Sequence, residues 1–516
     1  MFLHKVFALT LVMVCSISAD QVPRAAPPAY TVEYANQYIE ENKDTVIQTY
    51  RLNYHFMAPI GWINDPNGFI YYQGEYHLFY QFNPYDTFSQ KIHWGHAKTK
   101  DLIHWEHLPV ALAPDEWYDA DGVFSGSAIE KDGKLYVMYT GNSAEGQVQC
   151  IAVSEDGIHF EKVPENPVLD ANDLPSNAQA PDFRDPKVFK RGDLYYVVLV
   201  TKTTDNRGEV LLYQSADLIN WEFKSILLEG TSEQGIMWEC PDLYQLDGKD
   251  VLVLSPIQIP RVGNEYWNID SVVEFVGTMD WESGKMAVET VKELDHGMDF
   301  YATQSLEDQQ GRRIVIAWMA MWGRNFPTDT LGHHWAGSMT LPRELHVKDG
   351  LLTQVPVAEA FNITQNPVEY FGVYLTDEVR EFNQVSGETG LLNIVVNLNV
   401  ASVFTIDLRA NENEKTVLTY NTESQELILD RTSSGITIIG GENPTVYSRI
   451  VNVPLVRSRL ILQIFLDVSS VEVFVNEGVE TMTSTIYPTE ATSSAIRFGV
   501  QGTAAIDSLS FSSISV

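Results

Sequence analysis

Residues 64–82 read NDPNGFIYYQGEYHLFYQF. A polar motif, Asn64-Asp65-Pro66, leads into one strand, a turn glycine at Gly74 and a second, strongly apolar strand over residues 76–82. Aromatic and β-branched residues on both sides of a turn glycine are typical of a β-hairpin. The stretch therefore predicts two antiparallel strands, the first of which begins at an acidic residue.

The same arrangement occurs five times along the chain. Positions 65, 125, 185, 239 and 299 are 60, 60, 54 and 60 residues apart, and each begins a unit of about four short strands. The motifs are Asn64-Asp65-Pro66, Phe124-Ser125-Gly126, Arg184-Asp185-Pro186, Glu239-Cys240-Pro241 and Asp299-Phe300-Tyr301. Turn glycines follow in step at Gly74, Gly133, Gly192, Gly248 and Gly311. Five such repeats predict a five-bladed β-propeller over residues 51–347.

The pattern changes after the fifth repeat. Residues 357–516 alternate apolar and polar side chains between turns, which is typical of a β-sandwich, and residues 348–356 are the expected linker. The predicted fold class is therefore all-β, a five-bladed β-propeller followed by a C-terminal β-sandwich. Before the propeller, residues 20–50 form an N-terminal extension with one candidate helix over Val32–Thr45.

The first residues have the form of a secretory signal peptide. Lys5 precedes the apolar run Val6–Cys15, which is too short to span a bilayer, and small residues follow to Ala19. We therefore expect cleavage near residue 19 and a secreted protein with a glycosylation sequon at Asn362. Cys150 and Cys240 remain after cleavage, and the sequence leaves open whether they are bridged.

Composition and charge exclude several classes of protein. The chain has 516 residues, of which 44% are hydrophobic and 20% charged, so neither global disorder nor a membrane bundle fits. With 34 Lys and Arg against 69 Asp and Glu, the formal net charge is −35. Such a surface repels phosphates, so we expect neither nucleic acid nor a membrane as a partner. A neutral substrate is indifferent to this field.

Four of the five repeat positions are carboxylates: Asp65, Asp185, Glu239 and Asp299. Equivalent points on the inner strands of a propeller surround one central funnel, so we expect these side chains to lie together. A group of carboxylates without matching cations is electrostatically unfavourable and is typical of a functional site. The alternative for each single Asp is a structural role, at a strand end or as an acceptor for turn amides.

Two carboxylates that flank a glycosidic bond are the usual apparatus of glycoside hydrolysis. Asn64 and backbone donors should hold Asp65 ionised for attack. Glu239 lies between apolar and weakly polar neighbours, which should keep it protonated as a general acid. The cation of Arg184 should keep the adjacent Asp185 ionised.

Several motifs together resemble glycoside hydrolase family 32, the β-fructofuranosidases that include invertases, inulinases and levanases. They are Trp62–Gly68, Gln81–Pro84, Trp94–His96, Phe124–Ser127, Arg184–Pro186, Glu239–Asp242 and Ser469–Asn476, so the resemblance covers about residues 51–516. It implies that Asp65 is the nucleophile, Glu239 the acid/base and Asp185 the transition-state stabiliser. The substrate-binding residues that it implies are Trp62, Asn64, Gln81, Trp94, Phe124, Ser125, Arg184, Asp299, Tyr301 and Trp322.

The resemblance predicts a secreted retaining enzyme that hydrolyses sucrose and related fructosides. Fructan hydrolysis and fructosyl transfer are alternatives within the family, and a non-catalytic fructan-binding protein is an alternative outside catalysis. We expect a small neutral sugar as substrate, a monomer or homodimer, and neither cofactor nor metal. The loop at Asp119–Gly122 lacks the spacing of a calcium site, and His93, His96 and His333-His334 lack further ligands for zinc.

Overall fold

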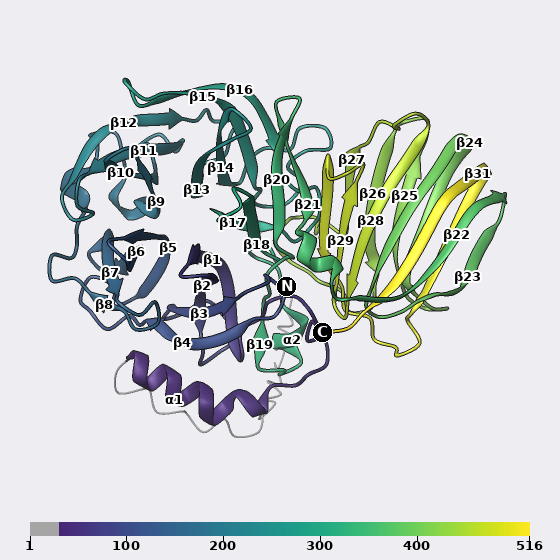
Figure 1. The fold of residues 1–516 in the computed structure, drawn as a ribbon, viewed down its shortest axis with the longest axis horizontal. Coiled ribbons are helices and arrows are strands. Elements are labelled where there is room, and N and C mark those ends of the chain that lie inside the picture. The colour runs from purple at the N-terminus through teal and green to yellow at the C-terminus, as the bar shows by residue number, and fades with distance from the viewer. Residues whose placement is uncertain (1–29) are drawn as a thin grey trace, which may run out of the picture.

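The computed structural model describes residues 30–516, and the predicted signal peptide, residues 1–19, lies outside the described residues. Five antiparallel sheets surround a central axis, and a second all-β domain lies beside the fifth sheet (Figure 1). The predicted five-bladed propeller and C-terminal sandwich are confirmed.

Each blade is a sheet of four successive strands, numbered outward from the axis. Blade 1 consists of β1 (Gly61–Tyr72), β2 (Glu75–Asn83), β3 (His93–Thr99) and β4 (Glu106–Leu112), and blade 2 of β5 (Gly122–Lys131), β6 (Lys134–Ser143), β7 (Gly146–Ser154) and β8 (Glu161–Lys162). Blade 3 consists of β9 (Arg184–Arg191), β10 (Leu194–Lys202), β11 (Gly208–Ser215) and β12 (Trp221–Glu229). Blade 4 consists of β13 (Met237–Leu246), β14 (Lys249–Ile257), β15 (Val273–Asp280) and β16 (Lys285–Glu293). Blade 5 consists of β17 (Tyr301–Glu307), β18 (Arg313–Trp318), β20 (Arg343–Lys348) and β21 (Leu351–Pro356).

Glycine recurs at the same place in every repeat because of the backbone conformation there. Gly74, Gly133, Gly192, Gly248 and Gly311 each join the first and second strands of a blade, with φ between +62° and +92°. An ordinary L-residue is strained there, and glycine is not. The repeat thus follows from a left-handed turn that every blade uses.

Each of the five inner strands also contains a β-bulge near its start. The register shifts lie between Ile63 and Pro66 in β1, Phe124 and Gly126 in β5, Arg184 and Lys187 in β9, Glu239 and Asp242 in β13, and Tyr301 and Gln304 in β17. A bulge leaves residues unpaired and bends the strand, so it changes the direction of the side chains at that point. Four of the five polar motifs, those of blades 1 to 4, coincide with these bulges.

Apolar clusters between neighbouring blades hold the ring together. Leu78 of β2 and Ile316 of β18 belong to the same cluster, which joins blade 1 to blade 5. The short strand β19 (Trp335–Ala336) closes the ring as well, since it leaves blade 5 and pairs in parallel with the start of β1. The segment between β18 and β19 includes the one-turn helix α2 (Pro327–Thr330).

The predicted linker at residues 348–356 is wrong. Six residue pairs join β21 to β20, so Leu351–Pro356 is the outermost strand of blade 5. The strand is too short for its alternation of apolar and polar residues to distinguish it from a loop. The connecting segment follows it and contains the 3₁₀ turn Ala358–Phe361. The exposed Asn362 ends this turn.

The second domain has two layers that share two long strands. β24 (Gly390–Ala410) and β31 (Ala495–Ile514) pair along their length and pass from one layer into the other. One layer adds β22 (Thr364–Thr376), β28 (Arg459–Asp467), β29 (Ser470–Val475) and β30 (Glu480–Thr485). The other adds β23 (Val379–Ser386), β25 (Lys415–Asn421), β26 (Glu426–Ser433) and β27 (Ser448–Asn452). One large apolar cluster fills the space between the layers.

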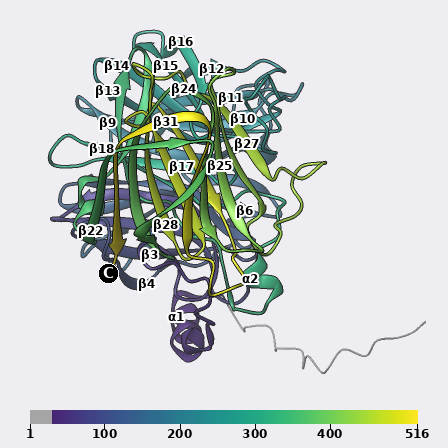
Figure 2. The same cartoon turned by 90° about the vertical axis from the view of Figure 1, so that its right-hand side faces the viewer.

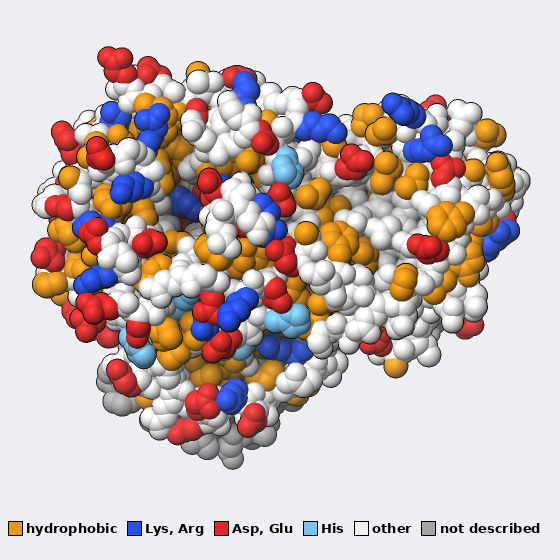
Figure 3. Space-filling model, in the orientation of Figure 1, with side chains coloured by type: hydrophobic (Ala, Val, Ile, Leu, Met, Phe, Trp, Pro, Cys, Tyr) orange, Lys and Arg blue, Asp and Glu red, His pale blue; other side chains and the backbone are white. Residues whose placement is uncertain are grey.

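The extension before the propeller contains the predicted helix. α1 (Val32–Asn42) begins after Thr31, whose side chain accepts the Tyr34 N–H, and it lies along β4 of blade 1 (Figures 1 and 2). Acidic and basic side chains are interspersed over the visible face of both domains (Figure 3). Among residues 30–516 no helix is long and apolar enough to cross a membrane.

Candidate active site

The bulges of all five inner strands meet at one point on the propeller axis. A small internal cavity there is lined by Pro66, Ser125, Asp185, Cys240 and Thr303, one from each blade. Three carboxylates lie around this point, Asp65, Asp185 and Glu239, and we refer to them as the acid cluster. Residues up to 174 positions apart in sequence are therefore brought together on a rigid scaffold, as the repeat predicted.

Both oxygens of the Asp65 carboxylate accept hydrogen bonds. Asn64 Nδ2 donates to Oδ1 at 2.9 Å, and Ser125 Oγ donates to Oδ2 at 2.6 Å. The Cys240 thiol lies 3.6 Å from Oδ2. Burial and the charge of Glu239 raise the pKa of Asp65 above its usual value, and these three donors oppose part of that rise. The donors also fix the direction of the carboxylate, as a nucleophile requires.

The ionised form of Asp185 is less favoured than the adjacent Arg184 led us to predict. Burial raises its pKa to about 7; Arg184 opposes this shift, and the charges of Glu239 and Asp65 add to it. Arg184 thus favours the ionised form of Asp185, as predicted, but it does not outweigh burial and the charges of Glu239 and Asp65. The bulge is the physical reason: it sends the two side chains in different directions, and Arg184 pairs with Glu239 and Asp182 instead. The Cys240 N–H, 2.9 Å from Oδ2, is the donor to Asp185.

Glu239 lies in a more polar environment than its sequence neighbours predicted. Arg184 Nη2 donates to Oε1 at 2.9 Å, and Tyr301 Oη donates to Oε2 at 2.6 Å. The Glu239 side chain retains 20% of its exposure, so it is accessible from the funnel. A carboxyl group held by two donors at one end of an open funnel is well placed to exchange a proton with a substrate.

Tyr301 has two possible acceptors for its one proton. Its hydroxyl lies 2.6 Å from Glu239 Oε2 and 3.2 Å from the carbonyl oxygen of Ser255. When Glu239 is ionised, the phenol can donate to the carboxylate. When Glu239 is protonated, the carboxylic acid can donate to Tyr301, whose own proton then turns to Ser255. The side chain can thus satisfy both protonation states of Glu239 without moving.

The other predicted substrate contacts divide into accessible and buried residues. Trp62 donates to Asn64 Oδ1 at 2.7 Å and stacks against Trp322, which is half-buried, as is Phe124. Trp94 is fully buried, and its indole N–H donates to the Phe124 carbonyl at 3.0 Å. The prediction of Trp94 as a substrate contact is therefore wrong.

Gln81 is buried and has a similar supporting role. Its amide donates to the carbonyl of Val123 at 3.0 Å. Gln81 and Trp94 thus fix the backbone on either side of Phe124, at the bulge that presents Ser125 to Asp65. They thereby position Ser125, the hydrogen-bond donor that blade 2 supplies to Asp65 of the acid cluster.

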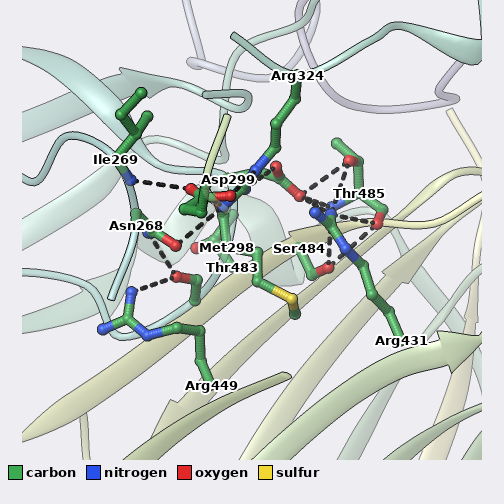
Figure 4. A network of polar contacts seen from close by, with 12 residues as sticks. Asn268, Ile269, Met298, Asp299, Arg324, Arg431, Arg449, Thr483, Ser484 and Thr485 are labelled. Atoms are coloured by element: carbon green, nitrogen blue, oxygen red, sulfur yellow. Dashed lines mark hydrogen bonds and ion pairs between the residues drawn. The ribbon is translucent and has the colours of Figure 1, made fainter. Parts of the chain in front are cut away.

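Asp299 does not lie in the funnel. Its carboxylate pairs with Arg324 at 3.0 Å, contacts Arg431 and accepts the Thr485 N–H at 2.8 Å, so it joins the propeller to the sandwich (Figure 4). The side chain is only 3% exposed. The prediction of Asp299 as a substrate contact is wrong because the bulge of blade 5 lies at Ala302 and Thr303, after Asp299.

Sequence reasoning missed several supporting residues. Thr140 Oγ1 accepts the Asp185 N–H at 3.0 Å, and Asp182 pairs with both Arg184 and Lys202 at 3.1 Å. Burial and the charge of Glu239 raise the pKa of Asp270 to about 7. None of these lies in a motif with a fixed spacing to the repeat, so only the folded chain places them. Cys150 and Cys240 are both free thiols, which settles the question that the sequence left open.

The geometry defines a class of enzyme. A firmly held carboxylate, a second and accessible carboxyl group, and a third at their side are the groups that a glycoside hydrolase needs.

Comparison with known proteins agrees. Residues 55–356 match the glycosyl hydrolases family 32 N-terminal domain, and residues 362–515 match the C-terminal domain of the same family. A sucrose-6-phosphate hydrolase of Zymomonas mobilis is 37% identical over 481 residues, which are 88% of this chain and 90% of the relative. A raffinose invertase of Escherichia coli is 37% identical over 456 residues, covering 84% and 89%.

Solved structures share the fold as well. The Bombyx mori β-fructofuranosidase superposes with a TM-score of 0.80 at 33% identity, covering 94% of this chain and 98% of that one. A sucrose-6-phosphate hydrolase from Lactobacillus gasseri gives a TM-score of 0.83 at 29% identity, covering 94% and 99%. The chain therefore belongs to glycosyl hydrolase family 32, which confirms the resemblance seen in its motifs, and it is a glycoside hydrolase.

Proposed function

We propose that this protein is a secreted, retaining β-fructofuranosidase that releases fructose from sucrose. The observation that carries the proposal is the hydrogen bonding of Asp65, which both Asn64 and Ser125 direct into the funnel beside Glu239. Relatives named for sucrose-6-phosphate, raffinose and β-fructofuranoside hydrolysis support the fructoside as substrate. A variant of the Bombyx mori enzyme has been solved with sucrose bound.

In this mechanism Asp65 attacks the anomeric carbon of the fructosyl unit while Glu239 protonates the departing oxygen. The C–O bond to the leaving group breaks as the bond to Asp65 forms, and the leaving sugar departs with the proton of Glu239. Glu239, now ionised, takes a proton from water, which attacks the same carbon and releases fructose and the free Asp65 carboxylate. Tyr301 can serve both stages, because it has an acceptor in either protonation state of Glu239.

Asp185 contributes charge rather than a bond. Retaining glycosidases pass through a transition state in which the sugar ring carries positive charge. A carboxylate beside that ring binds the cationic transition state more strongly than the neutral substrate, so it lowers the barrier. The developing cation also favours the ionised form of Asp185, whose pKa burial raises to about 7.

We propose neutral sucrose, rather than its 6-phosphate, as the preferred substrate. The cations nearest the acid cluster are already matched, since Arg184 pairs with Asp182 and Glu239, and Lys202 pairs with Asp182. The formal net charge of −35 also opposes a phosphorylated sugar. A kcat/KM for sucrose above that for sucrose-6-phosphate is expected, and the reverse order would overturn this part.

The extent of fructan hydrolysis and fructosyl transfer depends on the acceptor side of the funnel. Product analysis on sucrose, raffinose, inulin and levan separates these alternatives, and absence of any released sugar would leave a fructan-binding protein. Secretion is tested by the N-terminal sequence of the protein recovered from culture medium, expected near residue 20. Recovery from inside cells with residues 1–19 intact would contradict it. Asn362 is exposed, as a glycan would require.

The retaining mechanism is tested by separating the two catalytic carboxyl groups. Glu239→Gln should lower turnover of sucrose by about 10²–10⁴-fold, because the leaving oxygen is no longer protonated. An aryl fructoside with a leaving group that needs no proton should still react quickly in the first step. The fructosyl-enzyme should then accumulate, because Glu239 also activates water.

The measurement is a pre-steady-state burst, with mass detection of one fructosyl unit on the peptide that contains Asp65. Gln147→Ala, which removes only a 3.4 Å contact to Arg184, is the matched control and should show no adduct. Equal losses for Glu239→Gln on both substrates, with no adduct, would overturn the assignment of the acid.

A further inference from the structure

A cavity of about 490 Å³ lies at the opposite end of the propeller from the acid cluster. It is lined by the C-terminal parts of all five inner strands, for example by Phe69, Ile129, Lys190, Tyr244 and Leu306. The acid cluster lies near the N-terminal ends of these strands. We name this space the distal cavity. Its volume is that of a site for a small molecule.

The distal cavity gathers cations in a strongly acidic protein. Its lining includes Lys187, Lys190, Arg191 and Arg313. The side chain of Lys187 is 11% exposed, donates to the Ser305 carbonyl at 2.6 Å and pairs with Asp242 at 3.2 Å. Lys190 and Arg191 are exposed at the end of β9, and neither forms an ion pair within the described residues. Two cations at the rim are therefore free to bind a ligand.

The carboxylates of the lining are mostly occupied. Glu307 pairs with Arg313 at 3.2 Å, and Asp250 is buried and accepts the Met279 N–H at 2.7 Å. Glu130 is the third carboxylate and is exposed. Lys190 and Arg191 of the lining thus have no ion-pair partner among the described residues, and neither do the buried Asp250 and the exposed Glu130.

Two arginines of the cavity are held flat on aromatic rings. The guanidinium of Arg191 lies 4.4 Å from the ring centre of Trp281, and that of Arg313 lies 4.6 Å from the ring centre of Tyr244. Such stacking fixes the plane of the guanidinium and leaves its edge free to donate. A planar edge of this kind matches two oxygens of a carboxylate or phosphate.

Four buried polar atoms of lining residues have no partner in the described structure. They are Tyr244 Oη, Trp281 Nε1, Ser305 Oγ and Arg313 Nε. Buried polar groups in proteins are almost always hydrogen-bonded, so each exception calls for an explanation. All four carry a hydrogen, and two of them can only donate. Each of these four groups could therefore be satisfied by an acceptor.

We propose that the distal cavity binds a small anion with two or more carboxylate or phosphate groups. Arg191 and Lys190 would hold one anionic group at the rim, and Arg313 another further in. The two cations at the rim then gain a partner of opposite charge. Carboxylate and phosphate ligands share this chemistry, and the two probes below distinguish them.

The test is titration calorimetry of the whole chain with citrate and, separately, with inorganic pyrophosphate, at about 20 mM ionic strength. Low salt is needed because binding at a rim is strongly screened. The double variant Lys190→Gln/Arg191→Gln should weaken binding at least tenfold, and both residues are exposed, so the fold should be kept. Lys100→Gln/Lys348→Gln removes the same charge from exposed positions outside the cavity and should change affinity less than twofold.

Binding of citrate alone would assign a carboxylate ligand, and binding of pyrophosphate alone a phosphate ligand. Three results would overturn the proposal. The first is no saturable binding of either anion at concentrations up to about one millimolar, which keeps the ionic strength low. The second is equal weakening in both double variants. The third is binding of neutral glucose that is lost in Lys190→Gln/Arg191→Gln, because it would make the cavity a sugar site. Identical melting temperatures of the two double variants in buffer without ligand exclude unfolding as the cause.

Discussion

Asp185 and Asp299 occupy corresponding places in the sequence repeat, yet the fold gives them opposite environments. Asp185 lies with Asp65 and Glu239, and burial with these like charges raises its pKa to about 7 despite Arg184. Asp299 is equally buried, but Arg431 and Arg324 hold its pKa below the usual value. The first carboxylate belongs to the acid cluster, and the second to the contact between propeller and sandwich, which we call the junction.

Other buried carboxylates of the junction are also paired with cations. Arg343 pairs with Glu472 and with Asp295 at 3.0 Å, and the ring nitrogens of His55 lie 2.8 Å from Asp467 and 2.7 Å from Glu472. Each buried carboxylate there has a cation from the other domain or from a neighbouring segment. Matched buried charges fix an interface, whereas unmatched ones store the electrostatic energy that a reaction can use. The same residue type thus serves structure or chemistry according to its partners.

The largest expected effect is on turnover and comes from changing a carboxylate of the acid cluster. Asp65→Asn should lower turnover of sucrose and of an activated aryl fructoside by about 10⁴-fold or more, because loss of a nucleophile removes the covalent step altogether. The melting temperature should stay the same or rise, since one of three like charges is gone. Steady-state kinetics and calorimetry check both parts. A marked fall in melting temperature would place Asp65 among the structural carboxylates.

The next effect breaks the junction. Asp299→Asn leaves Arg431 and Arg324 with less compensation in a buried site, and loss of one partner of a buried pair costs about 3–5 kcal/mol in free energy of unfolding. The kcat of the folded variant should change less than twofold, as measured alongside urea unfolding.

Asp205→Asn is the matched control for that change. Asp205 pairs with Arg207 at 2.9 Å on the surface, with 66% of its side chain exposed, so its removal should cost about 1 kcal/mol or less. Equal losses in the two variants, or a loss of kcat specific to Asp299→Asn, would contradict the division between junction and acid cluster.

Two buried groups, His55 of the junction and Glu274 of blade 4, should make the protein less stable as the pH rises. In His55, burial opposes the charge, but hydrogen bonds to Asp467 and Glu472 raise the pKa to about 9. Its contribution is therefore complete below pH 6.5 and lost as the pH rises through 9. Burial raises the pKa of Glu274 to about 8, so the folded state holds a proton that the unfolded state releases, and this contribution is also lost by pH 8. The free energy of unfolding should fall by a few kcal/mol between pH 6 and 9.

Urea unfolding at these pH values checks the decrease. His55→Gln should flatten the slope between pH 6.5 and 9, whereas His104→Gln, at an exposed histidine 2.6 Å from Asp101, should leave it unchanged. In the acid range, burial is outweighed by Arg343 and His55, which lower the pKa of Glu472 to about 2. Its contribution is present above pH 4.5 and is lost as the pH falls toward 2. Stability that rises from pH 6 to 9 would contradict the account.

The smallest effect sharpens the role of Tyr301. Tyr301→Phe removes one hydrogen bond to Glu239 and should lower kcat by about threefold to tenfold, with a displaced limb in the pH–rate profile and an unchanged KM. Phe326→Leu, which changes a ring packed against Trp62, is a control for altered packing and should not displace the profile. A raised KM with unchanged kcat would make Tyr301 a substrate contact, as the resemblance implied.

The repeat predicted the blades and the acid cluster because both depend on local signals. A turn glycine with positive φ and a bulge next to the polar motif occur in the same place in each blade, and the spacing records them. Blade 5 broke the prediction, because its bulge at Ala302 and Thr303 carries no carboxylate and the nearest acid in sequence is Asp299. Asp299 therefore lies outside the funnel.

The partners of these residues could not be predicted. Arg184 was expected to serve Asp185, its neighbour in sequence, but the bulge gives it to Glu239, 55 residues away. Arg431 reaches Asp299 across 132 residues, and such pairs have no periodicity that a single sequence could display. The small strand β21 was missed for a related reason, since its place is decided by pairing with β20.

The strand β19 has a consequence for the order in which the chain can fold during synthesis. Trp335 and Ala336 pair with Gly61 and Trp62. The sheet of the first blade is therefore completed only by a segment that leaves the ribosome much later. Asp299 waits longer still, because Arg431 and Thr485 are made near the end of the chain. A ribosome-bound chain that stops at residue 356 can have all five blades, but Asp299 would have only Arg324 of its two arginines and Arg343 only Asp295 of its two carboxylates. The last part of the protein to be made therefore completes the first.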